Sequence, residues 1–230
     1  MSAAPTMLVV AKAPIAGQAK TRLAATVGDH AAARIAAASL LDTLDVVEGL
    51  GWPVVIAMAG DLDEAAEADE LASACGRHRV IAQRGDTFAA RLAAAHHDAD
   101  SGHGVVQIGM DTPQVTTESL QTAAAALECY DAALGPAEDG GWWVLAVRAP
   151  GWASCLATVE MSRPDTGLRT KEALVRGGAR VASVPIMTDV DVWEDAHAVA
   201  SLIPHSRFAA EVARAAELER GHAQQIGSQP

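Results

Sequence analysis

Short runs of apolar residues alternate with longer amphipathic segments along most of this chain. The short runs are typical of buried strands, whereas apolar positions three and four residues apart in the longer segments are typical of helices. This pattern predicts strands at 8–11, 54–58, 79–82, 105–108, 131–134, 142–147 and 180–185. It predicts helices after residue 22 and at 29–49, 61–74, 86–99, 116–127, 165–177, 193–202 and 205–220.

Strands alternate with helices up to about residue 130, which favours right-handed crossovers and a mainly parallel sheet with helices on both faces. Beyond that point the alternation loosens, and a mixed sheet with a hairpin-like addition is expected. Neither an internal repeat nor a linker interrupts the pattern. We therefore predict one α/β domain over residues 7–203, a C-terminal helical extension over 204–220 and a disordered tail over 221–230.

The composition narrows the class of protein. Of the 230 residues, 50% are hydrophobic but only 3% are aromatic, so the core must be built from Ala, Val, Leu and Ile. The net charge of −12 argues against nucleic acid or an anionic membrane as a partner. No window is long and apolar enough for a membrane span, and the first residues lack the basic start of a signal peptide. The three cysteines are far apart and form no CxxC, so we expect neither a disulfide nor a zinc site, and a cytoplasmic location.

One loop near the N-terminus carries the clearest chemical signal. The stretch VVAKAPIAGQAKTRL, residues 9–23, combines a strand end, a loop with Gly17 and an Ala-rich helix start. Only three of the 17 basic residues are lysines, and two of them, Lys12 and Lys20, lie in this loop beside Arg22. A strand, a cationic glycine-containing loop and a helix together present backbone N–H groups and positive charge to a phosphate. The alternative is a solvated loop with incidental charges.

Two common nucleotide motifs are missing from the sequence. A Walker A loop ending at Lys20-Thr21 would need glycines at positions that are Pro14 and Ala19 here. No GxGxxG occurs, so a Rossmann dinucleotide site has no support. Although the whole chain is acidic, residues 1–34 carry a net positive charge, because they contain four Lys and Arg residues and one acidic residue, Asp29. A small phosphorylated ligand fits this contrast better than a polyanion.

Acidic residues follow several of the predicted strands. In open α/β sheets the ligand lies beyond the carboxyl ends of the strands. Asp111 follows the fourth strand, Asp139 lies in the loop after the fifth, and Asp189 and Asp191 follow the last. Paired carboxylates that face a phosphate-binding loop supply the hard oxygen ligands that Mg²⁺ needs.

A resemblance to a known family rests on five motifs in order: K-x-P-x-x-G-x-x-K-T-R-L at 12–23, the segment 83–92, G-x-D-x-P at 109–113, G-P-A-x-D-G-G at 135–141 and D-V-D-x-x-E-D at 189–195. Over roughly residues 7–203 the chain resembles the DUF2064 family, also called transferase 1, rSAM/selenodomain-associated. That family belongs to the GT-A, nucleotide-diphospho-sugar transferase superfamily. The layout is also similar to that of the phospholactate and molybdopterin guanylyltransferases. The resemblance implies a single-domain GT-A-like fold of three layers with a mainly parallel, mixed sheet.

The charges and the resemblance together imply roles for individual residues. Lys20 and Arg22 would neutralise nucleotide phosphates, and Asp111 with Asp191 would hold Mg²⁺, or Mn²⁺ in its place. Asp139 would orient or deprotonate the acceptor. The expected site residues are Lys20, Asp111 and Asp139 for catalysis; Lys12, Gly17, Lys20, Thr21, Arg22, Gln83 and Arg91 for the nucleotide; Asp139, Gly140, Gly141 and Trp142 for the acceptor; and Asp111 and Asp191 for the metal.

Several of these residues have simpler explanations. Asp111 and Asp139 are of a type that is common in turns, and Arg91 could do no more than cap its helix. The choice of Asp191 over Asp189 as the metal ligand rests on the resemblance alone. Each of these alternatives stays open on the sequence.

Two departures from the family pattern leave the acceptor open. The family usually has Tyr after its paired glycines, where this chain has Trp142-Trp143, and only one of two adjacent strand residues can line a site. The family's W-S-T or M-S-T reads Met161-Ser162-Arg163 here. Elsewhere, His96-His97 has no third ligand nearby in the sequence, which favours core or surface histidines over a zinc site.

The favoured function is a Mg²⁺-dependent nucleotidyltransferase. It would move a nucleoside monophosphate from a nucleoside triphosphate to a small phosphorylated or carboxylated acceptor and release pyrophosphate. A glycosyltransferase that uses a nucleotide-sugar is the first alternative, and a non-catalytic nucleotide-binding protein is the second. The expected partners are a nucleotide and a small-molecule acceptor, with no nucleic acid and no membrane. The oligomeric state stays open, with a homodimer as one option.

Overall fold

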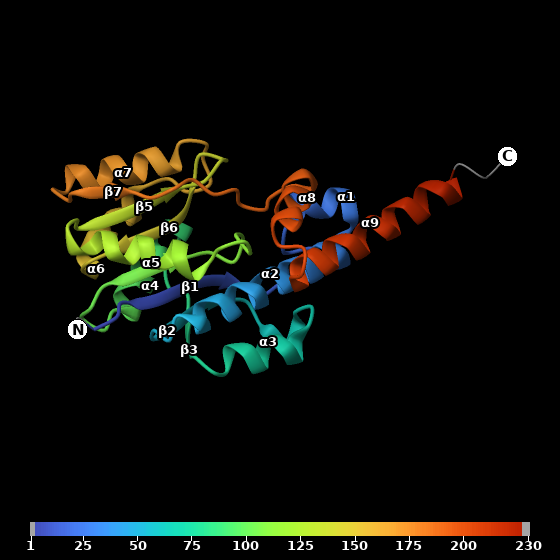
Figure 1. Ribbon diagram of the computed structural model, residues 1–230, viewed down its shortest axis with the longest axis horizontal. Coiled ribbons are helices and arrows are strands. Elements are labelled where there is room, and N and C mark those ends of the chain that lie inside the picture. Colours follow the sequence, from blue (N-terminus) through green and yellow to red (C-terminus); the bar gives the residue numbers. More distant parts are fainter. Residues whose placement is uncertain (1–2, 227–230) are drawn as a thin grey trace.

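The computed structural model describes residues 3–226, in which a seven-stranded sheet lies between layers of helices (Figure 1). The strands run in the order β3-β2-β1-β4-β6-β5-β7 across the sheet. Their bounds are Thr6–Lys12 for β1, Val54–Ala59 for β2, Arg79–Ala82 for β3, Val105–Ile108 for β4, Ala132–Pro136 for β5, Trp142–Val147 for β6 and Val181–Ser183 for β7. β6 is antiparallel to β4 and β5, and the other named pairings are parallel. The predicted α/β fold with a mainly parallel, mixed sheet is confirmed.

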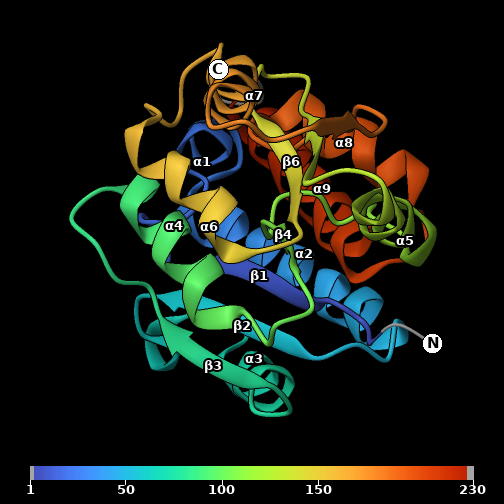
Figure 2. The same cartoon turned by 90° about the vertical axis from the view of Figure 1, so that its left-hand side faces the viewer.

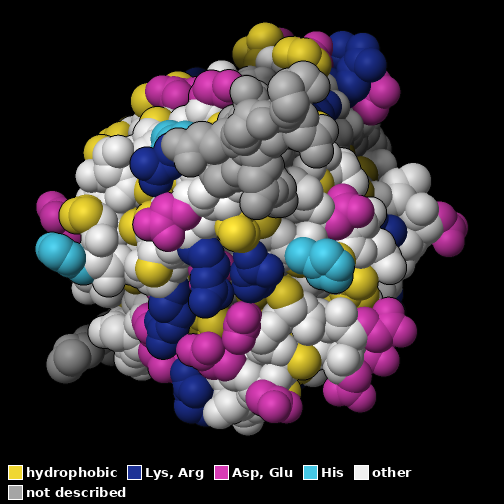
Figure 3. Space-filling view, turned by 90° about the vertical axis from the view of Figure 1, so that its right-hand side faces the viewer, with side chains coloured by type: hydrophobic (Ala, Val, Ile, Leu, Met, Phe, Trp, Pro, Cys, Tyr) yellow, Lys and Arg dark blue, Asp and Glu magenta, His cyan; other side chains and the backbone are white. Residues whose placement is uncertain are grey.

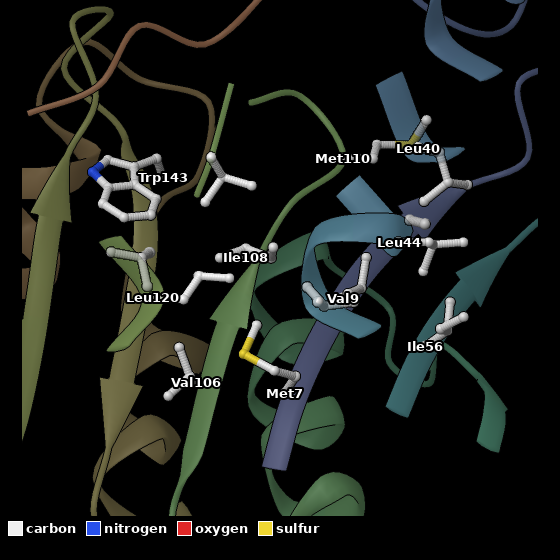
Figure 4. Packing of buried hydrophobic residues seen from close by; sticks show 14 of the residues in the cluster. Met7, Val9, Leu40, Leu44, Ile56, Val106, Ile108, Met110, Leu120 and Trp143 are labelled. Atoms are coloured by element: carbon white, nitrogen blue, oxygen red, sulfur yellow. The ribbon is translucent and has the colours of Figure 1, made fainter. Parts of the chain in front are cut away.

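Helices cover both faces of the sheet, as Figure 2 shows in a view turned by 90°. One face packs against α2 (Asp29–Gly49), α3 (Ala68–Cys75) and α5 (Thr117–Ala125). The other packs against α4 (Phe88–Ala99), α6 (Pro150–Ala153) and α7 (Thr166–Arg176). Successive residues of β1 point to opposite faces, so Met7 and Val9 join the first core and Leu8 and Val10 the second. The first core is drawn in Figure 4, where Leu40 and Leu44 of α2 face β1 and Leu120 faces β4.

A third group of helices lies at the carboxyl ends of the parallel strands, on the right in Figure 1. It consists of α1 (Thr21–Val27), α8 (Trp193–Leu202) and α9 (Arg207–Ile226), which share a small core with α2. Phe208 is fully buried there, and its backbone N–H donates to Asp42 at 2.8 Å. Arg207 reaches Asp45 on the same helix at 2.5 Å. The start of α9 is therefore fastened to α2.

Several element boundaries differ from the prediction. The helix expected at 61–74 is divided into a 3-10 turn, Leu62–Glu64, and α3, with Glu67 between them at a φ of +55°. The Asp61 carboxylate accepts from the Asp63 N–H at 3.0 Å and caps the first turn. The helix does not continue, because Ala65 is extended and the Ala66 N–H donates to the Pro14 carbonyl oxygen at 3.0 Å. α4 begins at Phe88 rather than Asp86, because Thr87 accepts from the Ala90 N–H at 3.1 Å and caps the helix.

The C-terminal half also contains helical residues that the sequence did not predict. α9 continues past the predicted end at residue 220 to Ile226, while residues 227–230 of the expected tail lie outside the described residues. Helical turns at Pro150–Ala153 and Ser154–Thr158 were not predicted. Within residues 3–226, none of the helices has the length and apolarity that a membrane crossing needs.

Candidate active site

The loop after β1 places Lys20 at the carboxyl ends of the central strands. Gly17 turns the loop with a φ of +75°, and Lys20 itself adopts a left-handed φ of +48° just before α1 begins. The Lys20 side chain is only 12% exposed, and its Nζ lies 2.6 Å from Oδ1 of Asp111. It also donates to the Val190 carbonyl oxygen. A left-handed residue other than glycine costs roughly 1–2 kcal/mol, and here it turns the ammonium inward between two acidic segments.

Asp111 is held in place by backbone contacts on both sides. The Ser39 hydroxyl of α2 donates to the Met110 carbonyl oxygen at 2.5 Å. The Val190 N–H donates to the Asp111 carbonyl oxygen at 2.8 Å, and Val190 is buried. This single bond fastens the D-V-D segment alongside the loop after β4. The two aspartates that flank Val190 consequently extend to different cavities.

Asp191 faces the cationic loop. Its Oδ2 lies 2.5 Å from Nη1 of Arg22, and this contact raises the pKa of the Arg22 guanidinium. Asp195 accepts from the backbone N–H groups of Asp191 and Val192 at 3.1 and 3.0 Å, just where α8 begins. The last acid of the D-V-D-x-x-E-D motif, Asp195, thus caps a helix rather than facing a ligand.

Asp189 lies on the other side of Val190. Burial raises the pKa of Asp189 to about 6, and the neighbouring carboxylates of Asp139 and Asp111 add to the rise, while Lys20 opposes it. Asp139 accepts from the Gly141 N–H at 2.7 Å through Oδ1, which is the turn role considered above. Its carboxylate therefore serves the loop and still borders the same cavity as Asp189.

A first cavity of about 390 Å³ opens next to the cationic loop. Gln83 is fixed there, because its side-chain N–H₂ donates to the carbonyl oxygens of Ala11 and Ala57 at 2.9 and 3.0 Å. The Arg91 guanidinium carbon lies 5.7 Å from the centroid of the Phe88 ring. Of the residues predicted to bind the nucleotide or metal, those that line this cavity are Lys12, Lys20, Thr21, Arg22, Gln83, Arg91, Asp111 and Asp191. Gly17 does not line it and shapes the loop instead.

A second cavity of about 210 Å³ lies on the other side of Asp111. Asp139, Gly141 and Trp142 of the predicted acceptor set line it. Trp143 is buried and donates its indole N–H to the Pro185 carbonyl oxygen at 2.9 Å, so only Trp142 faces the cavity. Gly140 lines a different hollow and packs against Pro164, where a Cβ atom would lie 1.8 Å from the carbonyl oxygen.

The second cavity also contains residues that the sequence did not single out. Phe88, Gln107 and Thr166 line it, and so does Arg163, which the sequence marked only as a departure from a family pattern. Gln107 is a polar residue in the middle of an otherwise apolar strand, which was the one available signal. Its neighbour His96 is fully buried, as expected for a core histidine, and burial lowers the pKa of His96 to about 4.

The two cavities meet at Asp111, which lines both. Figure 3 shows the face on the side of α1, α8 and α9, where Lys and Arg side chains gather next to Asp and Glu side chains. In the part of the chain that the structure describes, no three His, Cys, Asp or Glu side chains are grouped as a ready-made metal site. The carboxylates of Asp111 and Asp191 do share the first cavity, and each is paired with a cation of the chain. Such a two-carboxylate donor set fits a hard divalent cation whose other ligands are phosphate and water oxygens.

Comparisons with known proteins agree with this geometry. The family described as "Uncharacterized protein conserved in bacteria (DUF2064)" matches residues 40–163. A 3-phospho-D-glycerate guanylyltransferase from Phenylobacterium zucineum (strain HLK1) is 31% identical over 201 residues, which cover 84% of this chain and 89% of that protein.

Solved structures extend the likeness to the fold. A protein from Desulfovibrio desulfuricans G20, assigned as a nucleotide-diphospho-sugar transferase, matches with a TM-score of 0.81 and 27% identity over 94% of this chain and 97% of that chain. The manganese complex of Rv0371c from Mycobacterium tuberculosis H37Rv matches with a TM-score of 0.53 and 22% identity over 85% and 97%. The second likeness is one of fold alone. The predicted GT-A-like fold and the predicted transferase class are confirmed.

Proposed function

The chain belongs to the DUF2064 family, and from that premise we propose that it is a nucleotidyltransferase. It transfers a nucleoside monophosphate from a nucleoside triphosphate to a small phosphorylated or carboxylated acceptor, and it releases pyrophosphate. The nucleotide occupies the first cavity, the acceptor occupies the second, and the reaction takes place beside Asp111.

The observation that carries this proposal is the position of Asp111 at the junction of two cavities with opposite charge. On one side the ammonium of Lys20 lies 2.6 Å from its carboxylate, and Arg22 follows within the same loop. On the other side the lining is acidic and includes Asp139 and Asp189. A triphosphate needs the first environment, and an acceptor that must lie beside the α-phosphorus needs the second to be adjacent.

Asp111 and Asp191 are the proposed ligands of a divalent cation, for which Mg²⁺ is the first candidate and Mn²⁺ the second. When bound, this ion would draw negative charge from the nucleotide phosphates. Lys20 and Arg22 contact these same two carboxylates in the free chain. Once the carboxylates are otherwise engaged, both cations are free to turn toward phosphate oxygens a short distance away, which is the arrangement that stabilises charge in phosphoryl transfer.

The transfer itself is a single in-line substitution. An oxygen of the acceptor forms a bond to the α-phosphorus, and the bond from that phosphorus to the oxygen bridging it to the β-phosphate breaks. The electron pair leaves with pyrophosphate, whose charge Lys20 and Arg22 neutralise. A phosphate or carboxylate oxygen of the acceptor is already deprotonated near neutral pH, so the step needs no general base. Positioning and charge stabilisation carry it.

The relative from Phenylobacterium zucineum suggests which substrates to try first. Its name identifies a guanylyltransferase that acts on 3-phospho-D-glycerate. We therefore propose GTP as the nucleotide and a phosphorylated carboxylic acid as the acceptor. We propose a cytoplasmic location, because nucleoside triphosphates are available there and its reducing conditions keep cysteines, such as the three free ones of this chain, as thiols.

The test is pyrophosphate release by the full chain with GTP, MgCl₂ and 3-phospho-D-glycerate, together with mass spectrometry of the product. We expect release that depends on both substrates and stops when EDTA removes the metal. CTP, ATP and UTP serve as matched nucleotides. Turnover of GDP-sugars or UDP-sugars without pyrophosphate would contradict the proposal in favour of glycosyl transfer. Binding of GTP without turnover on any acceptor would contradict it in favour of a non-catalytic protein.

A further inference from the structure

The second cavity is lined by more acidic than basic residues, which limits where an anionic ligand can bind in it. Of the described residues that line it, Asp111, Asp139 and Asp189 are acidic and Arg163 alone is basic. An anionic acceptor entering this cavity meets repulsion from three carboxylates. Only at the Arg163 side does it meet a counter-charge. An anionic acceptor is therefore expected to direct one anionic group toward Arg163.

The Arg163 guanidinium forms one long, exposed ion pair within the described part of the protein. Its nearest acid is Glu160, at 4.0 Å, and the two side chains are 55% and 65% exposed. An exposed pair at that separation contributes little to stability. Asp165, two residues along, is bound by Arg169 at 2.7 Å, and Arg163 makes only a minor contribution to the lowered pKa of that carboxyl. Among residues 3–226 the guanidinium has no ion pair shorter than the 4.0 Å contact with Glu160, so it is available to a ligand.

The backbone that carries Arg163 is nevertheless firmly fixed. The Arg163 N–H donates to the Thr166 hydroxyl at 3.0 Å, and that hydroxyl donates to the Glu160 carbonyl oxygen at 3.1 Å. Ser162 is held at a left-handed φ of +58°. The Gly167 N–H donates to the Gly140 carbonyl oxygen at 2.8 Å, which clamps this segment against the loop that carries Asp139.

The close packing of these two segments explains why positions 140 and 167 are glycines. A Cβ atom at Gly140 would lie 1.8 Å from the Pro164 carbonyl oxygen, and one at Gly167 would lie 2.3 Å from the Gly141 carbonyl oxygen. Neither position has room for a side chain. The G-G loop and the segment around Arg163 therefore form one unit that borders the second cavity.

We propose that Arg163 binds the carboxylate of an acceptor that has two anionic groups, and thereby selects such an acceptor. The inference rests on the proposed function and names the acceptor class: a phosphorylated carboxylic acid whose phosphate oxygen reacts beside Asp111 while its carboxylate is bound at Arg163. A planar guanidinium matches a carboxylate through two parallel N–H···O bonds. Phosphate esters without the carboxylate lose this contact.

Direct binding tests the assignment without turnover. Isothermal titration calorimetry would measure the Kd of 3-phospho-D-glycerate for the full chain with Mg²⁺ and guanosine 5′-[α,β-methylene]triphosphate, in which the α–β bridge cannot be broken. For Arg163→Gln we expect a roughly 10- to 100-fold rise in that Kd, the value of a lost charge-assisted contact. Arg163→Lys keeps the charge but loses the paired geometry, so a smaller rise is expected. The Kd of the nucleotide analogue should stay the same.

The matched control is Arg176→Gln. Arg176 is exposed in the last turn of α7, the helix that begins three residues after Arg163, and it lies about 15 Å along the axis from Thr166. This variant has the same change of charge and should bind 3-phospho-D-glycerate as the unaltered chain does. An unchanged Kd in Arg163→Gln, or the same rise in both variants, would overturn the proposal. Absence of any 3-phospho-D-glycerate binding by the unaltered chain would overturn it too.

Selectivity separates this proposal from the proposed function. The unaltered chain should prefer 3-phospho-D-glycerate to glycerol 3-phosphate in kcat/KM, and Arg163→Gln should reduce that preference by roughly 10-fold or more. If Arg163→Gln releases pyrophosphate with an unaltered preference, the proposed function stands and the role of Arg163 is contradicted. If binding of 3-phospho-D-glycerate depends on Arg163 but no pyrophosphate is released, the role of Arg163 stands and the proposed function is contradicted.

Discussion

The two cavities that meet at Asp111 are built in different ways. The first takes most of its charged lining from one continuous loop, Lys12 to Arg22, and from the segment 83–91 in the parallel half of the sheet. The second is assembled from β4, the loop between β5 and β6, the segment 161–166 and Asp189. The proposed nucleotide side thus draws most of its cations from one continuous segment, whereas the proposed acceptor side is built from segments that are all distant from one another in sequence.

This difference has a chemical counterpart. Phosphates of any nucleotide make the same demand, which a compact cationic loop meets. Acceptors differ in size and charge, and we expect single residues that line the second cavity, such as Arg163 and Trp142, to distinguish them. The acceptor side is thus the part of the site where one substitution changes the substrate. The predictions that follow act on the shared residue, then on one side at a time.

Asp111→Asn should have the largest effect because it removes the charge that both sides share. We expect kcat for pyrophosphate release to fall at least about 100-fold, the usual cost of losing a key electrostatic contact at a reacting centre. The melting temperature should change little, because the Asp111 side chain is 45% exposed. Asp98→Asn is the control, since Asp98 lines neither cavity and its ion pair within the described part of the chain is with Arg84. Equal activity of the two variants would remove Asp111 from the site.

Lys20→Met should affect the nucleotide side selectively. The KM for GTP should rise roughly 10- to 100-fold, because a charge-assisted contact to phosphate is lost. The Kd of 3-phospho-D-glycerate should change much less. Lys171→Met removes the same charge from the exposed surface of α7 and should leave both values as they are. A rise confined to the acceptor would contradict the division between the cavities.

Gly167→Ala should affect the acceptor side selectively. The new methyl group would meet the Gly141 carbonyl oxygen at 2.3 Å, so the clamp must open. Overpacking of this kind lowers the free energy of unfolding by about 1–3 kcal/mol, which chemical denaturation would measure. The KM for the acceptor should rise several-fold at a constant KM for GTP. At Gly151 a Cβ atom has nothing within 4 Å, so Gly151→Ala should show neither effect.

The smallest expected effect concerns pH. Burial lowers the pKa of His96 to about 4, although the Gln107 carboxamide opposes the shift and neither ring nitrogen has a hydrogen-bond partner in the described part of the chain. Below about pH 6.5, the ordinary pKa of histidine, His96 binds a proton in the unfolded chain but stays neutral in the folded chain. This contribution to the free energy of unfolding is therefore complete above about pH 6.5 and is lost as the pH falls toward 4.

Denaturation at pH 6.5 and 5.5 measures that loss, which should be about 1 kcal/mol over the first pH unit. His96→Gln should reduce the difference between the two pH values. His97→Gln changes the exposed neighbour on the same helix and should preserve it. Identical pH profiles for the two variants would show that His96 is not the group responsible.

Much of the fold and of the nucleotide side could be predicted because strand ends are visible in the sequence. The alternation of apolar runs located β1 and β4, and the residues that follow them, Lys20 and Asp111, lie 2.6 Å apart. This inference needed only local geometry. Alternation would place Asp189 and Asp191, two residues apart, on the same face of a regular strand, yet they line different cavities, so their separation could not be predicted in this way.

The rest could not be predicted because it depends on packing between distant segments. Nothing near Gly140 in sequence indicates that Pro164 will lie against it. Arg163 could be noticed only as a departure from a family pattern, and Gln107 only as a polar residue in an apolar strand. The break before α3 lies where the Ala66 N–H donates to the carbonyl oxygen of Pro14, a contact with a distant loop that composition does not reveal.

The hydrogen bond from the Val190 N–H to the Asp111 carbonyl oxygen lies between the two cavities, because Asp189 and Asp191 flank Val190 and line one cavity each. If the cavities hold the two proposed substrates, a shift of this segment on binding one would reach the aspartate that borders the other. Any resulting change in affinity would be equal in both directions. Such coupling would let the protein hold its nucleotide loosely until an acceptor arrives, which would protect the triphosphate from attack by water.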